Sequence, residues 1–219
     1  VAKNLPNSFS VLAASEENNL FFAPDTYMEK IAIGADLPNN LVDLDNSVEK
    51  NVSLLAEAKS TTPNKLTVCV LDRPRHNQII SSLKKMNVSL KLITDGDVSG
   101  VMYIVDKNSP VDMYMGIGGA PEGVLAAAAL SCYGAQIQTR LVLDSEESIR
   151  AKEMGITNLK KKYNIDDMIK GDVMFCATAI TSGDLANGVN DQNEFYETNT
   201  IALHKHGNIN TLFRNKHKK

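Results

Sequence analysis

Short apolar runs separated by polar turns characterise the first part of the chain. Residues 8–14 (SFSVLAA) and 19–23 (NLFFA) have the length and composition of β-strands, and a polar turn joins them. Residues 27–34 (YMEKIAIG) are predicted to extend the same sheet. Residues 46–59 predict an α-helix, because a capping residue and an early acid come before apolar residues at helical spacing.

From residue 66 onward, apolar strands alternate with helical patterns. The spacing predicts strands over 66–72, 89–94 and 111–116, and helices over 75–87, 97–107 and 120–134. Further strands are predicted over 136–143, 173–180 and 200–207, with a loop over 180–194. This order is typical of helices packed on a parallel or mixed sheet. We therefore expect an α/β fold with a mixed sheet and flanking helices.

Composition narrows the class of protein. The 219 residues are 43% hydrophobic and 22% charged, as in globular proteins, and no apolar run reaches the roughly 18–20 residues that span a bilayer. A net charge of −3 argues against a nucleic-acid partner, and the basic tail 213–219 is predicted to be a solvated chain end. Cys69, Cys132 and Cys176 lie singly in apolar runs, which predicts reduced core thiols and a cytoplasmic protein.

Three segments that follow predicted strands carry reactive side chains. They cover residues 71–76 (LDRPRH), 94–100 (TDGDVSG) and 116–123 (GIGGAPEG). Ligands of α/β sheets collect at the carboxyl ends of the strands. We therefore expect these three segments to meet at one edge of the sheet and to face one pocket.

The first segment places two arginines around a proline. Pro74 stiffens the turn, and the guanidinium groups of Arg73 and Arg75 can each bind phosphate oxygens through two N–H groups. The alternative is a pair of surface arginines at a helix start, where the helix dipole disfavours positive charge. His76 is interpreted as a residue at the start of the helix.

The second segment brackets Gly96 with two acids. Asp95 and Asp97 could hold a divalent cation or accept hydrogen bonds from sugar hydroxyl groups. The alternative is that Asp97 caps the helix that follows.

The third segment places three glycines and one acid at the start of a helix. Gly116, Gly118 and Gly119 allow backbone N–H groups to surround an anion, and the helix N-terminus adds positive potential. Glu122 would repel phosphate there unless a cation lies between them, which indicates a metal site. The alternative is that Glu122 only complements the helix dipole.

These motifs resemble those of a known family. The stretches APDTYMEKIAIG, LDRPRH, TDGDV, GIGGAPEGV and ATAITSGDL occur in the order and spacing of class II fructose-1,6-bisphosphatases, the GlpX-like family. The resemblance extends from Asn7 to His204. It implies a layered α/β fold of the lithium-sensitive phosphatase superfamily, in which residues 1–65 are the remainder of an N-terminal sheet domain with a connecting helix, and residues 66–219 form a C-terminal α/β domain.

The resemblance also implies an activity and a set of site residues. Members remove the 1-phosphate of fructose 1,6-bisphosphate in gluconeogenesis and glycerol metabolism, and some relatives accept sedoheptulose 1,7-bisphosphate. By position, Glu122 resembles a metal ligand for Mg²⁺ or Mn²⁺. The substrate-binding set is matched by Tyr27, Arg73, Pro74, Arg75, Asp95, Gly96, Asp97 and Gly119. A cytoplasmic homo-oligomer, either a dimer or a tetramer, with no membrane partner is implied as well.

The sequence departs from the family pattern in its acidic residues. The family's other metal-binding carboxylates, and the threonine linked to water activation, precede the region that matches this chain, so no catalytic residue is identified. The sequence starts at Val1 without an initiator methionine, and we expect it to be part of a larger enzyme, inactive by itself. We also expect exposed apolar surface along its N-terminal strands. The alternative is a sugar-phosphate-binding module without catalysis.

Overall fold

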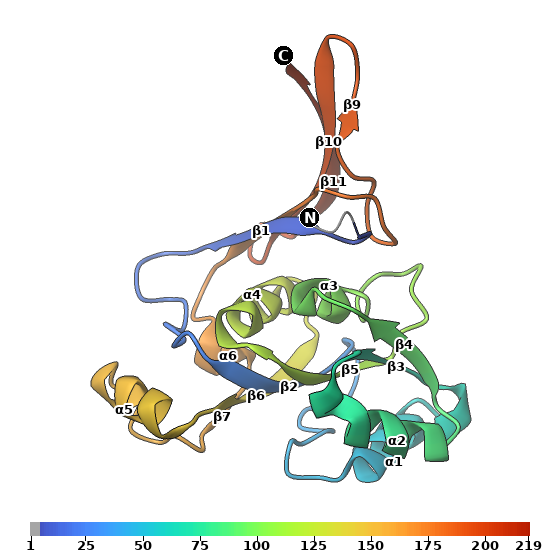
Figure 1. The fold of residues 1–219 in the computed structure, drawn as a ribbon, viewed down its shortest axis with the longest axis vertical. Helices are drawn as coiled ribbons and strands as arrows, with labels where there is room; N and C mark the ends of the chain where they lie inside the picture. Colours follow the sequence, from blue (N-terminus) through green and yellow to red (C-terminus); the bar gives the residue numbers. More distant parts are fainter. Residues whose placement is uncertain (1–4) are drawn as a thin grey trace.

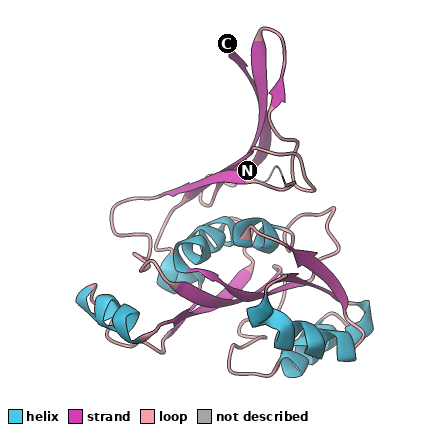
Figure 2. Ribbon diagram, viewed as in Figure 1, coloured by secondary structure: helices cyan, strands magenta, loops and turns pink. Residues whose placement is uncertain are grey.

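A six-stranded mixed sheet forms the centre of the molecule (Figures 1 and 2). The computed structural model describes residues 5–219. The strands lie in the order β4 (Ser89–Ile93), β3 (Thr67–Leu71), β5 (Met113–Gly119), β2 (Tyr27–Ile33), β6 (Gln136–Val142) and β7 (Lys162–Tyr163). Strands β4, β3 and β5 run parallel, whereas β2, β6 and β7 run antiparallel to their neighbours. The predicted α/β fold with a mixed sheet is confirmed.

Helices cover both faces of this sheet (Figure 1). One face carries α3 (Asp97–Met102) and α4 (Ala120–Ser131), and the other carries α1 (Val48–Ala58) and α2 (Asn77–Lys85). Two further helices, α5 (Ser145–Glu153) and α6 (Ile165–Met168), lie beside the β6–β7 side of the sheet. Among residues 5–219, no helix has the length and apolar composition needed to cross a membrane.

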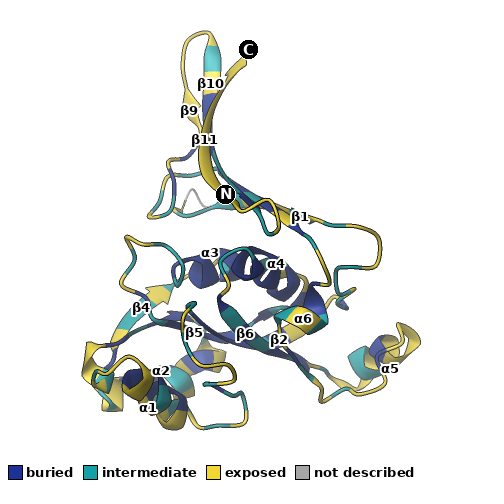
Figure 3. Cartoon of the chain, turned by 180° about the vertical axis from the view of Figure 1, so that it is seen from behind, coloured by how far each residue is buried: buried dark blue, intermediate teal, exposed yellow. Residues whose placement is uncertain are grey.

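A second, antiparallel sheet lies above α3 and α4 (Figure 1). Its strands are β1 (Phe9–Ala14), β8 (Met174–Ala179), β10 (Phe195–His204) and β11 (Ile209–Lys218), and the short β9 (Asn190–Asp191) pairs with β10. Helix α4 is almost entirely buried because it lies between the two sheets (Figure 3). After its first turn, α4 consists almost entirely of small or apolar residues, and these suit its position because larger side chains would separate the layers.

Several sequence predictions differ from the observed elements. Residues 19–23 do not form a strand, and only Leu20 makes an isolated bridge, to Ile169. Strand β2 belongs to a different sheet from β1. The tail from residue 213 continues strand β11, although its side chains are exposed as predicted. The pattern of charged residues predicted the exposure but not the pairing of β11 with β10. The division of the chain at residue 65 stays a prediction.

Strand β1 turns an apolar face to the interior and a mixed face, which includes Leu12, to solvent. Phe9, Val11 and Ala13 pack against the buried core around α4. Leu12 points outward and is 54% exposed, and Met174 on the neighbouring β8 is 50% exposed. These two side chains do not by themselves make an unusually apolar surface, so the expected apolar surface along the N-terminal strands stays a prediction, which light scattering would test.

The three cysteines are free thiols. Cys69 is buried in β3, and this burial raises the pKa of its thiol to about 12. Cys132 and Cys176 are only half-buried, so the prediction of core thiols is right for Cys69 alone. Cys176 is only half-buried because it lies on the same outward face of β8 as the exposed Met174, two residues before it.

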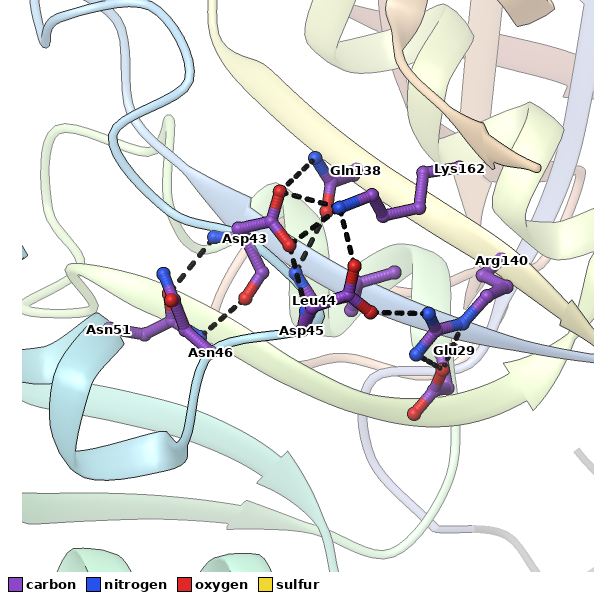
Figure 4. A network of polar contacts seen from close by, with 9 residues as sticks. All are labelled: Glu29, Asp43, Leu44, Asp45, Asn46, Asn51, Gln138, Arg140 and Lys162. Carbon is purple, nitrogen blue, oxygen red and sulfur yellow. Dashed lines mark hydrogen bonds and ion pairs between the residues drawn. The ribbon is translucent and has the colours of Figure 1, made fainter. Parts of the chain in front are cut away.

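A network of ion pairs holds the long connection between β2 and α1 against the sheet (Figure 4). Lys162 Nζ lies 2.7 Å from carboxylate oxygens of Asp43 and Asp45, and Arg140 reaches Asp45 at 2.6 Å and Glu29 at 2.8 Å. Because Arg140 and Lys162 belong to β6 and β7, this connection is fixed to the side of the sheet formed by β2, β6 and β7.

Candidate functional site

The three segments identified from the sequence meet at one edge of the six-stranded sheet. They follow β3, β4 and β5, which are parallel neighbours in the order β4-β3-β5, so their carboxyl ends lie together. The shared edge is confirmed, whereas a common pocket faced by all three segments stays a prediction. The site residues differ in accessibility: Tyr27, Pro74, Arg75, Asp95 and Glu122 are exposed, Arg73, Gly96 and Gly119 are half-buried, and Asp97 is buried.

Arg75 is held in place from two directions. Its Nε and Nη2 atoms donate to the carbonyl oxygen of Ile117 at 3.0 and 2.8 Å. Its guanidinium group also lies 4.9 Å from the ring centroid of Tyr27. An arginine has five N–H donors, so three remain for a ligand. Arg73 makes a weaker contact, because its Nη1 donates to the neighbouring Asp72 carbonyl at 3.4 Å.

His76 joins the first segment to the third from inside the protein. Its side chain is fully buried, its Nδ1 lies 2.7 Å from the Leu71 carbonyl oxygen, and its Nε2 accepts the Ile117 N–H at 2.8 Å. These partners require a neutral ring with the proton on Nδ1. The peptide group of Ile117 is therefore held by His76 at its N–H and by Arg75 at its carbonyl. Sequence reasoning took His76 for a residue at the start of the helix and missed this bridge.

Asp97 points into the protein and binds a buried lysine. Its Oδ2 lies 2.5 Å from the Nζ of Lys30 in β2. Burial lowers the pKa of Lys30, and the Asp97 carboxylate opposes that effect. Gly96, not Asp97, occupies the N-cap position of α3, so Asp97 does not cap this helix. Asp95 stays at the surface and accepts the N–H of Gly96 at 3.0 Å.

Lys30 is a second residue of this site whose role the sequence analysis missed. Met28, Lys30 and Ala32 alternate along β2 and are all buried, so Lys30 occupies an inward position. A lysine at an inward position of a predicted strand is the signal that could have identified it, because a buried lysine needs an anionic partner.

The glycine-rich segment is the end of a strand rather than a loop. Strand β5 continues to Gly119, and α4 begins at Ala120 without an intervening turn. The Ile117 N–H donates to His76, and the Ala120 N–H donates to the Thr26 carbonyl at 2.8 Å. These two N–H groups are therefore not available to surround an anion as the sequence suggested. The strand predicted over 111–116 stops short of the observed end at Gly119, because glycine has a low strand propensity and was interpreted as a loop residue.

Glu122 lies over the end of this strand. It is in the first turn of α4, and its carboxylate occupies the space where a side chain at Gly119 would be. Gly119 pairs with Tyr27 across β2 and β5, so Glu122, Tyr27 and Arg75 come from one small area of the surface.

The described residues do not form a complete metal site. Residues 5–219 contain no group of three or more His, Cys, Asp or Glu side chains placed to hold one ion. Asp97, the buried acid of the site, is already paired with Lys30. Since Mg²⁺ and Mn²⁺ take several oxygen ligands, Glu122 can supply at most one of the protein ligands that such an ion needs.

Acid is expected to destabilise the protein through His76. Burial lowers the pKa of His76 below its ordinary value, so the unfolded state binds this proton more readily. The buried neutral His76 therefore causes no loss of stability above about pH 6.5. As the pH falls below that value, the free energy of unfolding decreases by up to about 1.4 kcal/mol per pH unit. Urea unfolding at pH 7.5 and 5.5 would measure the loss. His76→Gln should lose this pH dependence, whereas substitution of the exposed His217 should keep it; equal pH dependence in all three would contradict the expectation.

Comparison with known proteins identifies relatives of the chain. The family model for glpX-encoded bacterial fructose-1,6-bisphosphatase matches residues 1–217. A curated relative from Synechococcus sp. (strain JA-3-3Ab), named D-fructose 1,6-bisphosphatase class 2/sedoheptulose 1,7-bisphosphatase, is 39% identical over 217 residues, which cover 93% of this chain and 62% of the relative. A relative of the same name from Trichodesmium erythraeum (strain IMS101) is 37% identical over 203 residues, covering 86% and 59%. The chain thus spans about three fifths of the length of these relatives.

Proposed function

Because the chain belongs to the family of glpX-encoded bacterial fructose-1,6-bisphosphatases, we propose that it provides the substrate-binding side of a sugar bisphosphatase. The proposed reaction is hydrolysis of the 1-phosphate of fructose 1,6-bisphosphate to give fructose 6-phosphate, a step of gluconeogenesis. Sedoheptulose 1,7-bisphosphate is a second proposed substrate, since both activities appear in the names of the relatives.

The meeting of the three strand-end segments is the observation that best supports this proposal. It brings two arginines, an exposed tyrosine and several acids to one sheet edge. We propose that Arg73 and Arg75 bind phosphate, that Tyr27 packs beside it, and that Asp95 accepts sugar hydroxyl groups. Pro74, Gly96, Asp97 and Gly119 complete the proposed substrate site by shaping its backbone and floor.

We further propose that Glu122 supplies one carboxylate to a divalent metal, either Mg²⁺ or Mn²⁺. A metal bound at a phosphatase site polarises phosphate and activates water. Because Glu122 is one ligand only, we propose that the other ligands come from the part of the relatives' length that this chain does not span.

A homo-oligomer is also proposed, and light scattering would test it.

A second candidate is a sugar-phosphate-binding module without catalysis. The lack of a complete metal-binding group within residues 5–219 favours this function for the chain by itself. Both candidates predict that the chain binds fructose 1,6-bisphosphate, and only the bisphosphatase predicts hydrolysis in a complete protein.

A hybrid enzyme separates the two candidates. Residues 1–217 would replace the matching part of the Synechococcus sp. (strain JA-3-3Ab) relative, and phosphate release would be measured with Mg²⁺, with Mn²⁺ and with a chelator. We expect metal-dependent release by the hybrid and none by the 219-residue chain. A hybrid that unfolds cooperatively and binds the bisphosphate without releasing phosphate would support the binding module instead.

Arg75→Ala is expected to weaken binding of fructose 1,6-bisphosphate to the chain about tenfold or more, and Arg75→Lys to weaken it less. Both changes remove the two-pronged donor, but lysine keeps the positive charge. Calorimetric titration would give the dissociation constants. Lys65→Ala, in the short turn before β3, is a control at a basic residue outside the site. Equal affinity of the wild type and Arg75→Ala would remove phosphate binding as the role of Arg75.

A further inference from the structure

Lys30 is a fully buried cation at the centre of the candidate site. Its side chain has 0% exposure, and its Nζ lies 2.5 Å from Asp97 Oδ2, which is itself buried. A charged side chain is placed in the interior only when a partner compensates the loss of hydration. The pair thus connects the middle of the sheet to the segment that follows β4.

Two glycines leave the space that this pair occupies. A Cβ atom at Gly118 would overlap the Asp97 carboxylate. A Cβ atom at Gly123, in the first turn of α4, would lie 3.0 Å from Lys30 Cε and 2.5 Å from Met28 Sδ. The backbones of β5 and α4 therefore approach Lys30 and Asp97 directly, with no side chain between them.

Lys30 also lies opposite the glycine-rich strand. In the pairing of β2 with β5, Lys30 is the partner of Gly116. The backbone of Lys30 therefore pairs with the third segment, and its side chain binds the carboxylate of the second segment. The charged group of Lys30 has no exposure to solvent. None of the roles given above to the exposed residues uses this arrangement.

We propose that Lys30 is a positioning residue for sugar-bisphosphate binding. It holds Asp97 beneath Gly118 and so fixes the end of β5 and the first turn of α4, without touching the ligand itself. The choice of a sugar bisphosphate as ligand rests on the proposed function. The positioning of residues 116–119 by Lys30 does not, and it can be measured without ligand.

Replacing Lys30 is expected to release both segments. Lys30→Met keeps the length of the side chain but leaves Asp97 buried without a counter-charge, and such a carboxylate is expected to move toward solvent. The space below Gly118 would then be unsupported. The result should be faster exchange of the backbone amides of residues 116–119 and weaker binding at the surface that they form.

The test combines two measurements on the 219-residue chain. Calorimetry with fructose 1,6-bisphosphate should give a dissociation constant at least tenfold higher for Lys30→Met than for the wild type. Hydrogen exchange without ligand should be at least tenfold faster at residues 116–119. Lys59→Met is the matched control, because Lys59 pairs with Asp112 just before the opposite end of β5. It should change neither quantity. Lys30→Gln keeps a donor for Asp97 and should give intermediate values.

Each outcome decides the proposal. Unchanged affinity in a folded Lys30→Met chain would overturn it, because Lys30 would then have a structural role alone. Weaker binding without faster exchange would also overturn it, since Lys30 would then contact the ligand directly. Loss of cooperative unfolding in both Lys30 variants would assign Lys30 to folding in general and reject the positioning role. If the wild type does not bind the bisphosphate, the proposed function fails, while the exchange measurement still supports or rejects the positioning of residues 116–119.

Discussion

Gly118→Ala is expected to lower the free energy of unfolding by about 3 kcal/mol or more. The new methyl group would overlap the Asp97 carboxylate, which cannot easily move because it is buried and paired with Lys30. Insertion of extra volume into a packed interior costs about 1–3 kcal/mol, and breaking a buried ion pair costs about 3–5 kcal/mol. Urea unfolding followed by circular dichroism would measure the change.

The neighbouring glycine provides a matched control. A methyl group at Gly119 would meet the carboxylate of Glu122, which is exposed and can rotate away. The backbone of Gly119 has φ −58° and ψ 140°, values that alanine adopts without strain. Gly119→Ala should therefore cost less than about 1 kcal/mol. Similar small losses for both variants would show that the space below Gly118 can adapt and that the ion pair does not fix it.

Glu122→Gln is expected to lower the turnover of the hybrid bisphosphatase at least 100-fold, which corresponds to about 2.7 kcal/mol in the activation free energy. Glutamine keeps the size and shape of the side chain but removes the charge proposed to bind the metal. The dissociation constant for the bisphosphate should change less than about tenfold, because the substitution leaves unchanged the contacts that we propose Arg73 and Arg75 make with phosphate. Phosphate release and calorimetry on the same variant would provide both values.

A second acid in the first turn of another helix tests the alternative role of Glu122. Glu146 is exposed and lies in the first turn of α5, away from the site. Glu146→Gln removes the same favourable interaction with a helix dipole but should leave turnover unchanged. If Glu122→Gln also keeps near-normal turnover, Glu122 acts on the helix alone and its assignment to the metal is wrong.

Sequence patterns predicted the helices and strands whose formation depends on residues close to one another in the sequence. The helix at α1 and the alternation of β3, α2, β4 and α3 follow from local spacing of apolar residues, and the elements are present in that order. The shared edge of the three segments followed from the same alternation, because parallel strands place their carboxyl ends together.

Residues brought together over long distances in the chain were not predictable in this way. The pair of Lys30 with Asp97 joins β2 to α3, and no local pattern indicates it. Gly118 was interpreted as a means of opening the backbone to an anion, but its absent side chain provides room for Asp97. Strand β1 was placed in one sheet with β2, whereas its partner is β8, near the other end of the sequence.

The pairing of β1 with β8 has a consequence for the order of folding. All of residues 15–173 separate the two strands, so this contact closes a very large loop, and contacts of this kind form slowly. During synthesis, β2, β5 and β6 can assemble once residues up to 142 have left the ribosome, while β1 must wait for residues 174–179. Throughout that interval Phe9, Val11 and Ala13 lack the strand that holds them against α4. The nascent chain therefore passes through a stage in which β1 lacks its partner β8 and is open to incorrect pairing, and completion of β8 ends that stage.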